Sequence, residues 1–215
     1  MVLSDEEFPT HSLPPSINRQ VSRGLEILWT KRNTRSFKKL LPTRERYPNA
    51  TIVTMDDDII YEPWRLRQLV EAAHARPDAI IGHRGWVVTA SKSGLELYAA
   101  WPKADLNTPE STCFLTTGGG TLFPAHILPD DILFDIDLAL RLCPLADDIW
   151  LWAVARKAGV SLICLGNNKI QSIKKVKLTS ALSQLNLYEG QNDVQLAAVI
   201  EYFKFNLPAS KALAE

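Results

Sequence analysis

A strand-like segment that ends in three consecutive carboxylates constrains this chain most. Residues 50–55 are mainly β-branched or apolar, which is typical of a buried parallel strand, and Asp56, Asp57 and Asp58 follow directly. Carboxylates crowded at a strand end repel one another and lose hydration, so we expect a divalent cation with oxygen ligands to neutralise them. A single acidic residue would fit a helix cap, but three in a row fit that alternative poorly.

The composition predicts one domain and excludes several classes of function. A chain of 215 residues with 46% hydrophobic residues can bury one core. Its 24 basic and 24 acidic residues balance, which argues against a generic nucleic-acid binder. Cys113, Cys143 and Cys164 are widely separated and are expected to be buried thiols in a reducing compartment. We see no leader peptide and no apolar run of about 20 residues, so we expect a soluble, cytoplasmic protein without a transmembrane segment.

Strand and helix patterns alternate along the chain, which predicts an α/β fold. The segment 91–111 reads as a long polar excursion. The expected strands are residues 2–4, 25–30, 50–55 and 79–82, with 86–90 extending the last one past a break. The expected helices are residues 16–23, 36–47 with a break near Pro42, 63–75, a helix opened by Asp147 and ended by Gly159, and a C-terminal segment at about 180–205.

Two further motifs carry chemical information. Gly118, Gly119 and Gly120 lie between apolar flanks, where missing side chains would let another group approach the backbone, or where the chain simply forms a bulge. Asp147 and Asp148 open an apolar helix. They are either helix-capping residues, or one of them faces a cleft as a catalytic or acceptor-binding carboxylate.

The order of the three motifs, over roughly residues 1–170, resembles that of GT-A fold glycosyltransferases. The strand before Asp56-Asp57-Asp58 corresponds to the DxD motif, and the glycine stretch and the Asp147-Asp148 pair follow in the family's order. The likeness is to bacterial polysaccharide-type enzymes and, in some respects, to exostosin-type transferase domains. It implies a Rossmann-like mixed sheet flanked by helices in a single domain spanning residues 1–215.

The resemblance also implies roles for single residues. Asp56 and Asp58 would hold Mn²⁺ or Mg²⁺ against the donor diphosphate. Either Asp57 or Asp56 would contact the donor ribose, directly or through another group. Asp148 would be the catalytic carboxylate or an acceptor contact. Gly119 and Gly120 would pack closely against the donor. Lys38, Lys39 and Arg84 are candidate contacts on the phosphate or base side because they lie near predicted strand or helix edges. Basic residues in such positions can also be simply solvated.

The implied activity is metal-dependent transfer of a hexosyl or related sugar from a nucleotide-diphosphate sugar to a glycan or lipid-linked acceptor, as in polysaccharide biosynthesis. The location would be the cytoplasm or the periphery of the inner membrane. The metal would offset the charge of the leaving diphosphate. A carboxylate that deprotonates the acceptor hydroxyl would give inversion at the anomeric carbon, and without such a base a retaining route is open. The alternatives are a nucleotidyltransferase, a metal-dependent phosphohydrolase and a non-catalytic module that binds nucleotide sugars. A glycine-rich basic N-terminal loop and a DxDxT pattern, which would favour the first two, are not seen.

One departure from the family pattern concerns the start of the chain. Residues 2–4 look like the second strand of the fold and not the first, so we expect the first βα unit to be missing. The strand before Asp56 should then have an open neighbouring position, or one filled by another chain. Because an open sheet edge templates pairing, self-association into a homo-oligomer is expected.

Overall fold

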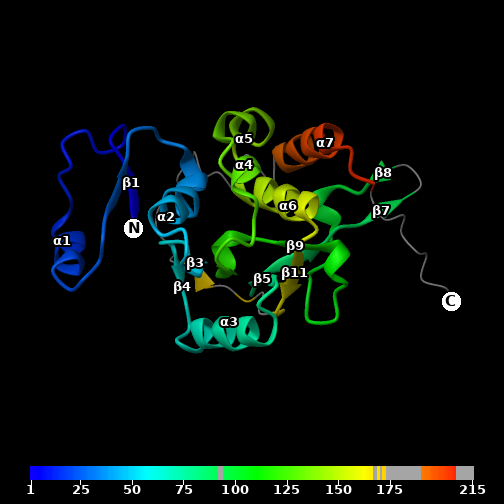
Figure 1. The fold of residues 1–215 in the computed structure, drawn as a ribbon, viewed down its shortest axis with the longest axis horizontal. Coiled ribbons are helices and arrows are strands. Elements are labelled where there is room, and N and C mark those ends of the chain that lie inside the picture. The colour runs from blue at the N-terminus through cyan, green and yellow to red at the C-terminus, as the bar shows by residue number, and fades with distance from the viewer. Residues whose placement is uncertain (92–93, 167–168, 170, 173–189, 207–215) are drawn as a thin grey trace.

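The chain folds into a mixed α/β structure with a central sheet between helical layers. This computed structural model describes residues 1–91, 94–166, 169, 171–172 and 190–206. Helix α3 (Trp64–Ala75) covers one face of the sheet, and α6 (Asp147–Ala158) covers the other with α7 (Gln191–Phe203) outside it (Figure 1). The remaining helices are α1 Pro15–Val21, α2 Leu41–Arg46, α4 Asp130–Leu133 and α5 Ile136–Leu142, and the 3₁₀ turns are η1 Arg35–Lys39, η2 Tyr98–Ala100, η3 Glu110–Thr112 and η4 Thr117–Gly119.

The central sheet has four strands in the order β11-β5-β10-β3. Strand β10 is antiparallel to both of its neighbours, and β11 is parallel to β5, so the sheet is mixed. Its strands are β3 Ile52–Thr54, β5 Ala79–Gly82, β10 Thr121–Phe123 and β11 Ser161–Cys164. Two-stranded pairs join β1 Val2–Ser4 to β2 Leu28–Thr30, β4 Ile59–Ile60 to β12 Gln171–Ser172, β6 Gly85–Val87 to β9 Cys113–Leu115, and β7 Ala90–Ser91 to β8 Gly94–Leu95.

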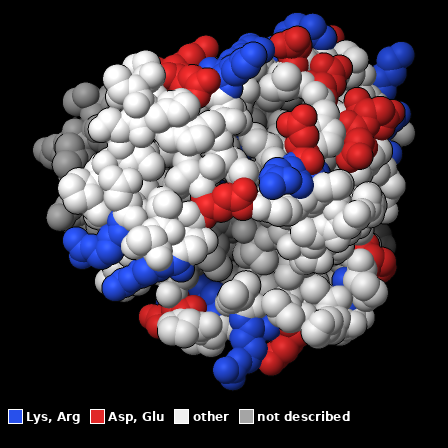
Figure 2. Space-filling model, turned by 60° about the vertical axis from the view of Figure 1, so that its left-hand side comes forward, with Lys and Arg blue, Asp and Glu red and all other residues white. Residues whose placement is uncertain are grey.

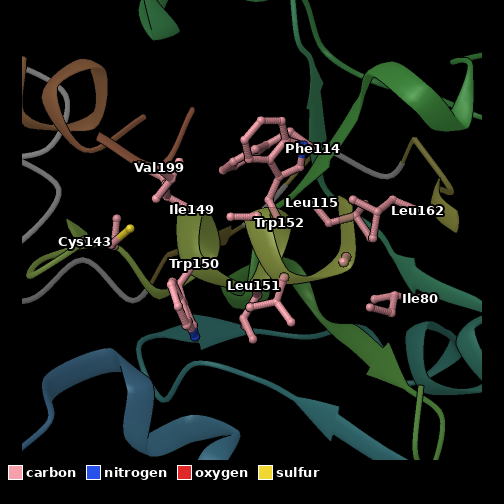
Figure 3. Close-up of a cluster of buried hydrophobic side chains, with 14 of the residues drawn as sticks. Ile80, Phe114, Leu115, Cys143, Ile149, Trp150, Leu151, Trp152, Leu162 and Val199 are labelled. Atoms are coloured by element: carbon pink, nitrogen blue, oxygen red, sulfur yellow. The ribbon is translucent and has the colours of Figure 1, made fainter. Parts of the chain in front are cut away.

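Alternation along the strands builds a core on each face of the sheet. Ile81 and Leu122 pack with Leu69 of α3 in a small cluster. Ile80 and Leu162 belong to the larger cluster, which includes most of α6. Some side chains of α6 extend toward Phe114 and Val199. Trp150 and Leu151 extend from the opposite side of the helix (Figure 3). A helix that is apolar on all sides is normally buried, as α6 is between the sheet and α7.

Most of the expected elements are present, and three expectations are wrong. The strand before Asp56 is not parallel, because among the described residues β3 pairs with β10 alone and that pairing is antiparallel. Residues 91–111 are not a polar excursion, because Tyr98, Trp101 and Ala104 are buried in the main core. Residues 86–90 do not extend the strand before them. Instead β6 turns away and pairs with β9, outside the four-stranded sheet. Periodicity cannot detect such a turn, since both segments are apolar enough to be strands.

The C-terminal helical segment is confirmed over residues 191–203, where α7 packs on α6. Residues 180–189 of the expected segment lie outside the described part of the chain. The helices that the structure describes include none with the length and apolar character to cross a membrane. The three cysteines are free and buried, as expected from their spacing.

Strand β3 lies at the edge of the sheet, as the expected open position requires. Among the described residues it pairs with β10 alone, and β1 pairs with β2 alone. Val2 and Leu3 of β1 and Ile52 and Val53 of β3 line one cleft of about 750 Å³. The two strand pairs therefore flank a space that no described strand fills.

Candidate functional site

The three motifs singled out in the sequence meet at the 3₁₀ turn η4. The main-chain N–H of Thr117 donates to the Asp148 carboxylate over 2.7 Å, and its hydroxyl donates to Asp147 over 3.1 Å. Gly118 lies against Asp56, because a Cβ added to Gly118 would be 2.2 Å from Oδ2 of that carboxylate. The end of β3, the glycine stretch and the start of α6 are thus in contact with one another.

The glycines allow this approach in different ways. Gly118 leaves room for Asp56, and Gly119 leaves room for Arg84, whose Cβ would be 2.4 Å from an added Cβ. Gly120 has φ of +91°, a conformation in which L side chains are strained, and it lies next to the buried ring of His83. Gly120 therefore shapes the turn between β9 and β10.

Lys39 is the cation of the site. Its ammonium lies 2.6 Å from Oδ1 of Asp56, with both side chains mostly covered, and 3.5 Å from the Thr117 hydroxyl. Burial alone would lower the pKa of Lys39, but the charges of Asp147, Asp56 and Asp148 outweigh it and raise that pKa well above its ordinary value. Lys39 is thus held in its charged form by three carboxylates.

The pKa of Asp148 differs from that of an ordinary aspartate. Burial and the neighbouring charge of Asp147 raise the pKa of Asp148 to about 6, although Lys39 and the Thr117 hydrogen bonds act in the opposite direction. Capping does not account for the pair. Ala146 is the N-cap residue of α6, no side chain hydrogen-bonds there as a cap, and Asp147 instead bonds the Thr117 hydroxyl.

Tyr61 is a site residue that the sequence analysis missed. Its hydroxyl accepts the main-chain N–H of Asp56 and donates to the carbonyl of Gly118, each over 2.7 Å. Burial is the main reason that the pKa of Tyr61 rises to about 12. Tyr61 therefore joins the strand end to the glycine turn. Its place three residues after the acidic triplet was the available signal.

The other expected residues divide between the cleft and its surroundings. Asp57 is exposed and lines the cleft together with Lys38, which forms an ion pair with Glu7. Asp58 is exposed to solvent. The Arg84 guanidinium lies 5.6 Å from the centre of the Trp86 ring, and its stem packs by Gly119. The structure therefore brings together Asp56, Asp148 and the glycine turn, and leaves Asp58 outside the residues that line the cleft.

Carboxylate oxygens at this strand end are of the ligand type that a hard divalent cation takes. In the described part of the chain, no three His, Cys, Asp or Glu side chains are arranged to hold a metal by themselves. Mg²⁺ commonly needs only one or two carboxylates when substrate phosphates supply the remaining ligands. Asp56 and Asp58 are the residues that would hold such a cation. Asp56 is shared with Lys39.

The cleft beside Asp56 is large enough for a small ligand. Its volume of about 750 Å³ falls in the range of ligand-binding pockets. Its charged lining residues are Glu7, Arg35, Lys38, Lys39, Asp56 and Asp57. Acidic and basic side chains are interspersed over the described part of the face shown in Figure 2, consistent with the net charge of zero.

No family model matches this chain. A search of curated proteins also finds no match. The assignment of a function therefore depends on the residues of the site and on their arrangement.

Proposed function

We propose that this chain is a metal-dependent glycosyltransferase domain of the GT-A type. It would move a sugar from a nucleotide-diphosphate donor to a glycan or lipid-linked acceptor. The observation that carries the proposal is the meeting of Asp56, Gly118 and Asp148 at one turn. These residues are distant in sequence, and the order of their segments resembles the family's.

The basic residues near Asp56 support donor binding in the cleft. Lys38 and Lys39 line it together with Asp56 and Asp57. A diphosphate needs cationic partners, and lysine binds phosphate as a point charge. A divalent cation at Asp56 and Asp58 would supply Lewis-acid stabilisation of the leaving diphosphate.

Asp148 is the best candidate for a base that accepts a proton from the acceptor hydroxyl. A carboxylate with a pKa near 6 is a stronger base than an ordinary aspartate and is still ionised at neutral pH. Its position at the start of α6 is fixed by the Thr117 hydrogen bond. Such a base would invert the configuration at the anomeric carbon.

The test of this proposal is donor binding with and without metal. Calorimetry with uridine- and guanosine-diphosphate sugars should show tighter binding in Mn²⁺ than in EDTA. Asp58→Ala should abolish that difference, while Asp131→Ala, which replaces an exposed aspartate at the start of α4, should preserve it. Equal affinity of the unmodified protein in Mn²⁺ and EDTA would refute metal dependence.

A second candidate is a non-catalytic module that binds a nucleotide sugar. The observation that favours it is the ion pair between Lys39 and Asp56, which engages the carboxylate closest to the glycine turn. The two candidates differ in product formation. Metal-dependent donor binding without transfer or donor hydrolysis would favour the module.

A further inference from the structure

Lys39 neutralises carboxylates that come from two different parts of the fold. It belongs to η1, Asp56 follows β3, and Asp147 and Asp148 open α6. The contact with Asp56 is direct, and the other two carboxylates reach the same region through Thr117, which lies 3.5 Å from the ammonium. Both members of the direct pair are shielded, with exposed side-chain fractions of 28% for Lys39 and 26% for Asp56.

The charges at this point do not cancel. Lys39 is a single ammonium beside the carboxyl groups of Asp56, Asp147 and Asp148, so the acidic groups outnumber it. A metal ion at Asp56 would nevertheless meet the ammonium at the same carboxylate. Two cations close together in a partly buried site repel each other strongly, because water screens them poorly there.

We propose that Lys39 is an internal competitor that keeps divalent cations from Asp56 until an anionic diphosphate arrives. This inference rests on the proposed function, since it concerns the same donor site. The diphosphate offers Lys39 an alternative partner, because an ammonium on a flexible four-carbon stem can move between nearby anions. Metal and nucleotide would then bind together, each weakly without the other, through a reciprocal coupling of their affinities.

A merely structural ion pair predicts a different behaviour. If Lys39 only stabilises the fold, its removal should destabilise the protein and leave the affinity for metal unchanged or lower. If Lys39 competes with the metal, its removal should destabilise the metal-free protein and raise the affinity for metal. The sign of the change in metal affinity therefore separates the two roles.

The experiment is a titration with Mn²⁺ alone, followed by electron paramagnetic resonance or calorimetry, with no nucleotide present. Lys39→Met should bind Mn²⁺ at least tenfold more tightly than the unmodified protein. Lys39→Arg, which keeps the charge, and Lys157→Met, which removes an exposed lysine in the last turn of α6, should bind like the unmodified protein. Lys39→Gln serves as a second neutral variant if Lys39→Met does not fold.

Adding uridine or guanosine diphosphate completes the test. The diphosphate should tighten Mn²⁺ binding to the unmodified protein by a larger factor than in the neutral variants, because those variants have no competitor to displace. A folded neutral variant whose Mn²⁺ affinity is unchanged or reduced would overturn the proposal. A separate measurement would show that the proposed function is wrong, namely the absence of donor-sugar binding or transfer by the unmodified protein.

Discussion

Thr117 donates its main-chain N–H to Asp148 over 2.7 Å, although the two residues are 31 positions apart in the sequence. The same threonine bonds Asp147 through its hydroxyl. This residue thereby connects the glycine turn to the start of α6 and fixes the orientation of two carboxylates. The site is built on that contact.

Replacing Asp148 by asparagine tests its catalytic role. Asp148→Asn retains an oxygen that can accept the Thr117 N–H but removes the basic carboxylate, so we expect turnover to fall by roughly 10²–10⁴-fold. Asp135→Asn is the matched control, because Asp135 caps α5 by accepting the Leu138 N–H. The control should retain turnover and lose at most about 0.5–2 kcal/mol of stability, measured by denaturant unfolding. Full turnover by Asp148→Asn would remove Asp148 from the chemistry.

The raised pKa of Asp148 makes stability depend on pH. Its folded-state pKa of about 6 exceeds the ordinary value of 3.8, so the folded state binds more protons between these values than the unfolded state does. The contribution of Asp148 to the free energy of unfolding should therefore decrease as pH rises from about 4 to about 6. Denaturant unfolding across this window should show a smaller decrease in Asp148→Asn. Transfer that uses Asp148 as a base should decline as pH falls below about 6.

Gly118→Ala tests the close approach of the turn to Asp56. A Cβ would lie 2.2 Å from the carboxylate oxygen, so either the turn or Asp56 must move, which we expect to cost roughly 1–3 kcal/mol. Gly119→Ala is the comparison, because its Cβ would meet Arg84 instead. Both variants should lose stability in thermal unfolding, but Gly118→Ala should impair metal-dependent donor binding more. Equal donor affinity in the two variants would contradict a role for Asp56 in that binding.

The open edge of β3 should promote self-association at high protein concentration, since unpaired main-chain groups beside apolar side chains template pairing. Met55 follows β3, lines the cleft and is 38% exposed. Sedimentation velocity should show concentration-dependent association that Met55→Lys reduces. Val21→Lys changes a similarly exposed apolar residue on α1, outside the cleft, and should have no effect. A protein that remains monomeric at all accessible concentrations would contradict this expectation.

The sequence predicted local structure better than it predicted contacts between distant segments. The strand before Asp56 and the helix after Ala146 were recognisable because apolar runs and a terminating glycine mark them. The contacts of Asp56 and Asp148 with the glycine stretch come from the fold, since neither motif by itself says what it lies against. The role of Lys39 could not be derived in this way, since lysine at a turn is usually solvated and only the fold places it beside Asp56.

The residues that were missed act through main-chain atoms. Tyr61 bonds an N–H and a carbonyl, and Thr117 donates its own N–H. Residue type says little about such bonds, because every residue except proline carries the same main-chain donor and acceptor. The burial of Tyr98 and Trp101 was missed because these two residues, which contribute to the core, lie among polar residues in the sequence.

Strands β1 and β2 lie outside the four-stranded sheet, so the unit that contains them should unfold separately from the rest of the fold. Helix α1 buries none of its residues, and the β1–β2 pair shares no strand hydrogen bonds with the central sheet among the described residues. Such a unit can open by itself, because little buried apolar area is lost when it moves away. Amide protons of Val2–Ser4 should thus exchange with solvent through partial opening, whereas those of Ala79–Gly82 should exchange only through global unfolding. The cleft beside Asp56 would widen with each partial opening, at a free energy below that of unfolding the whole domain.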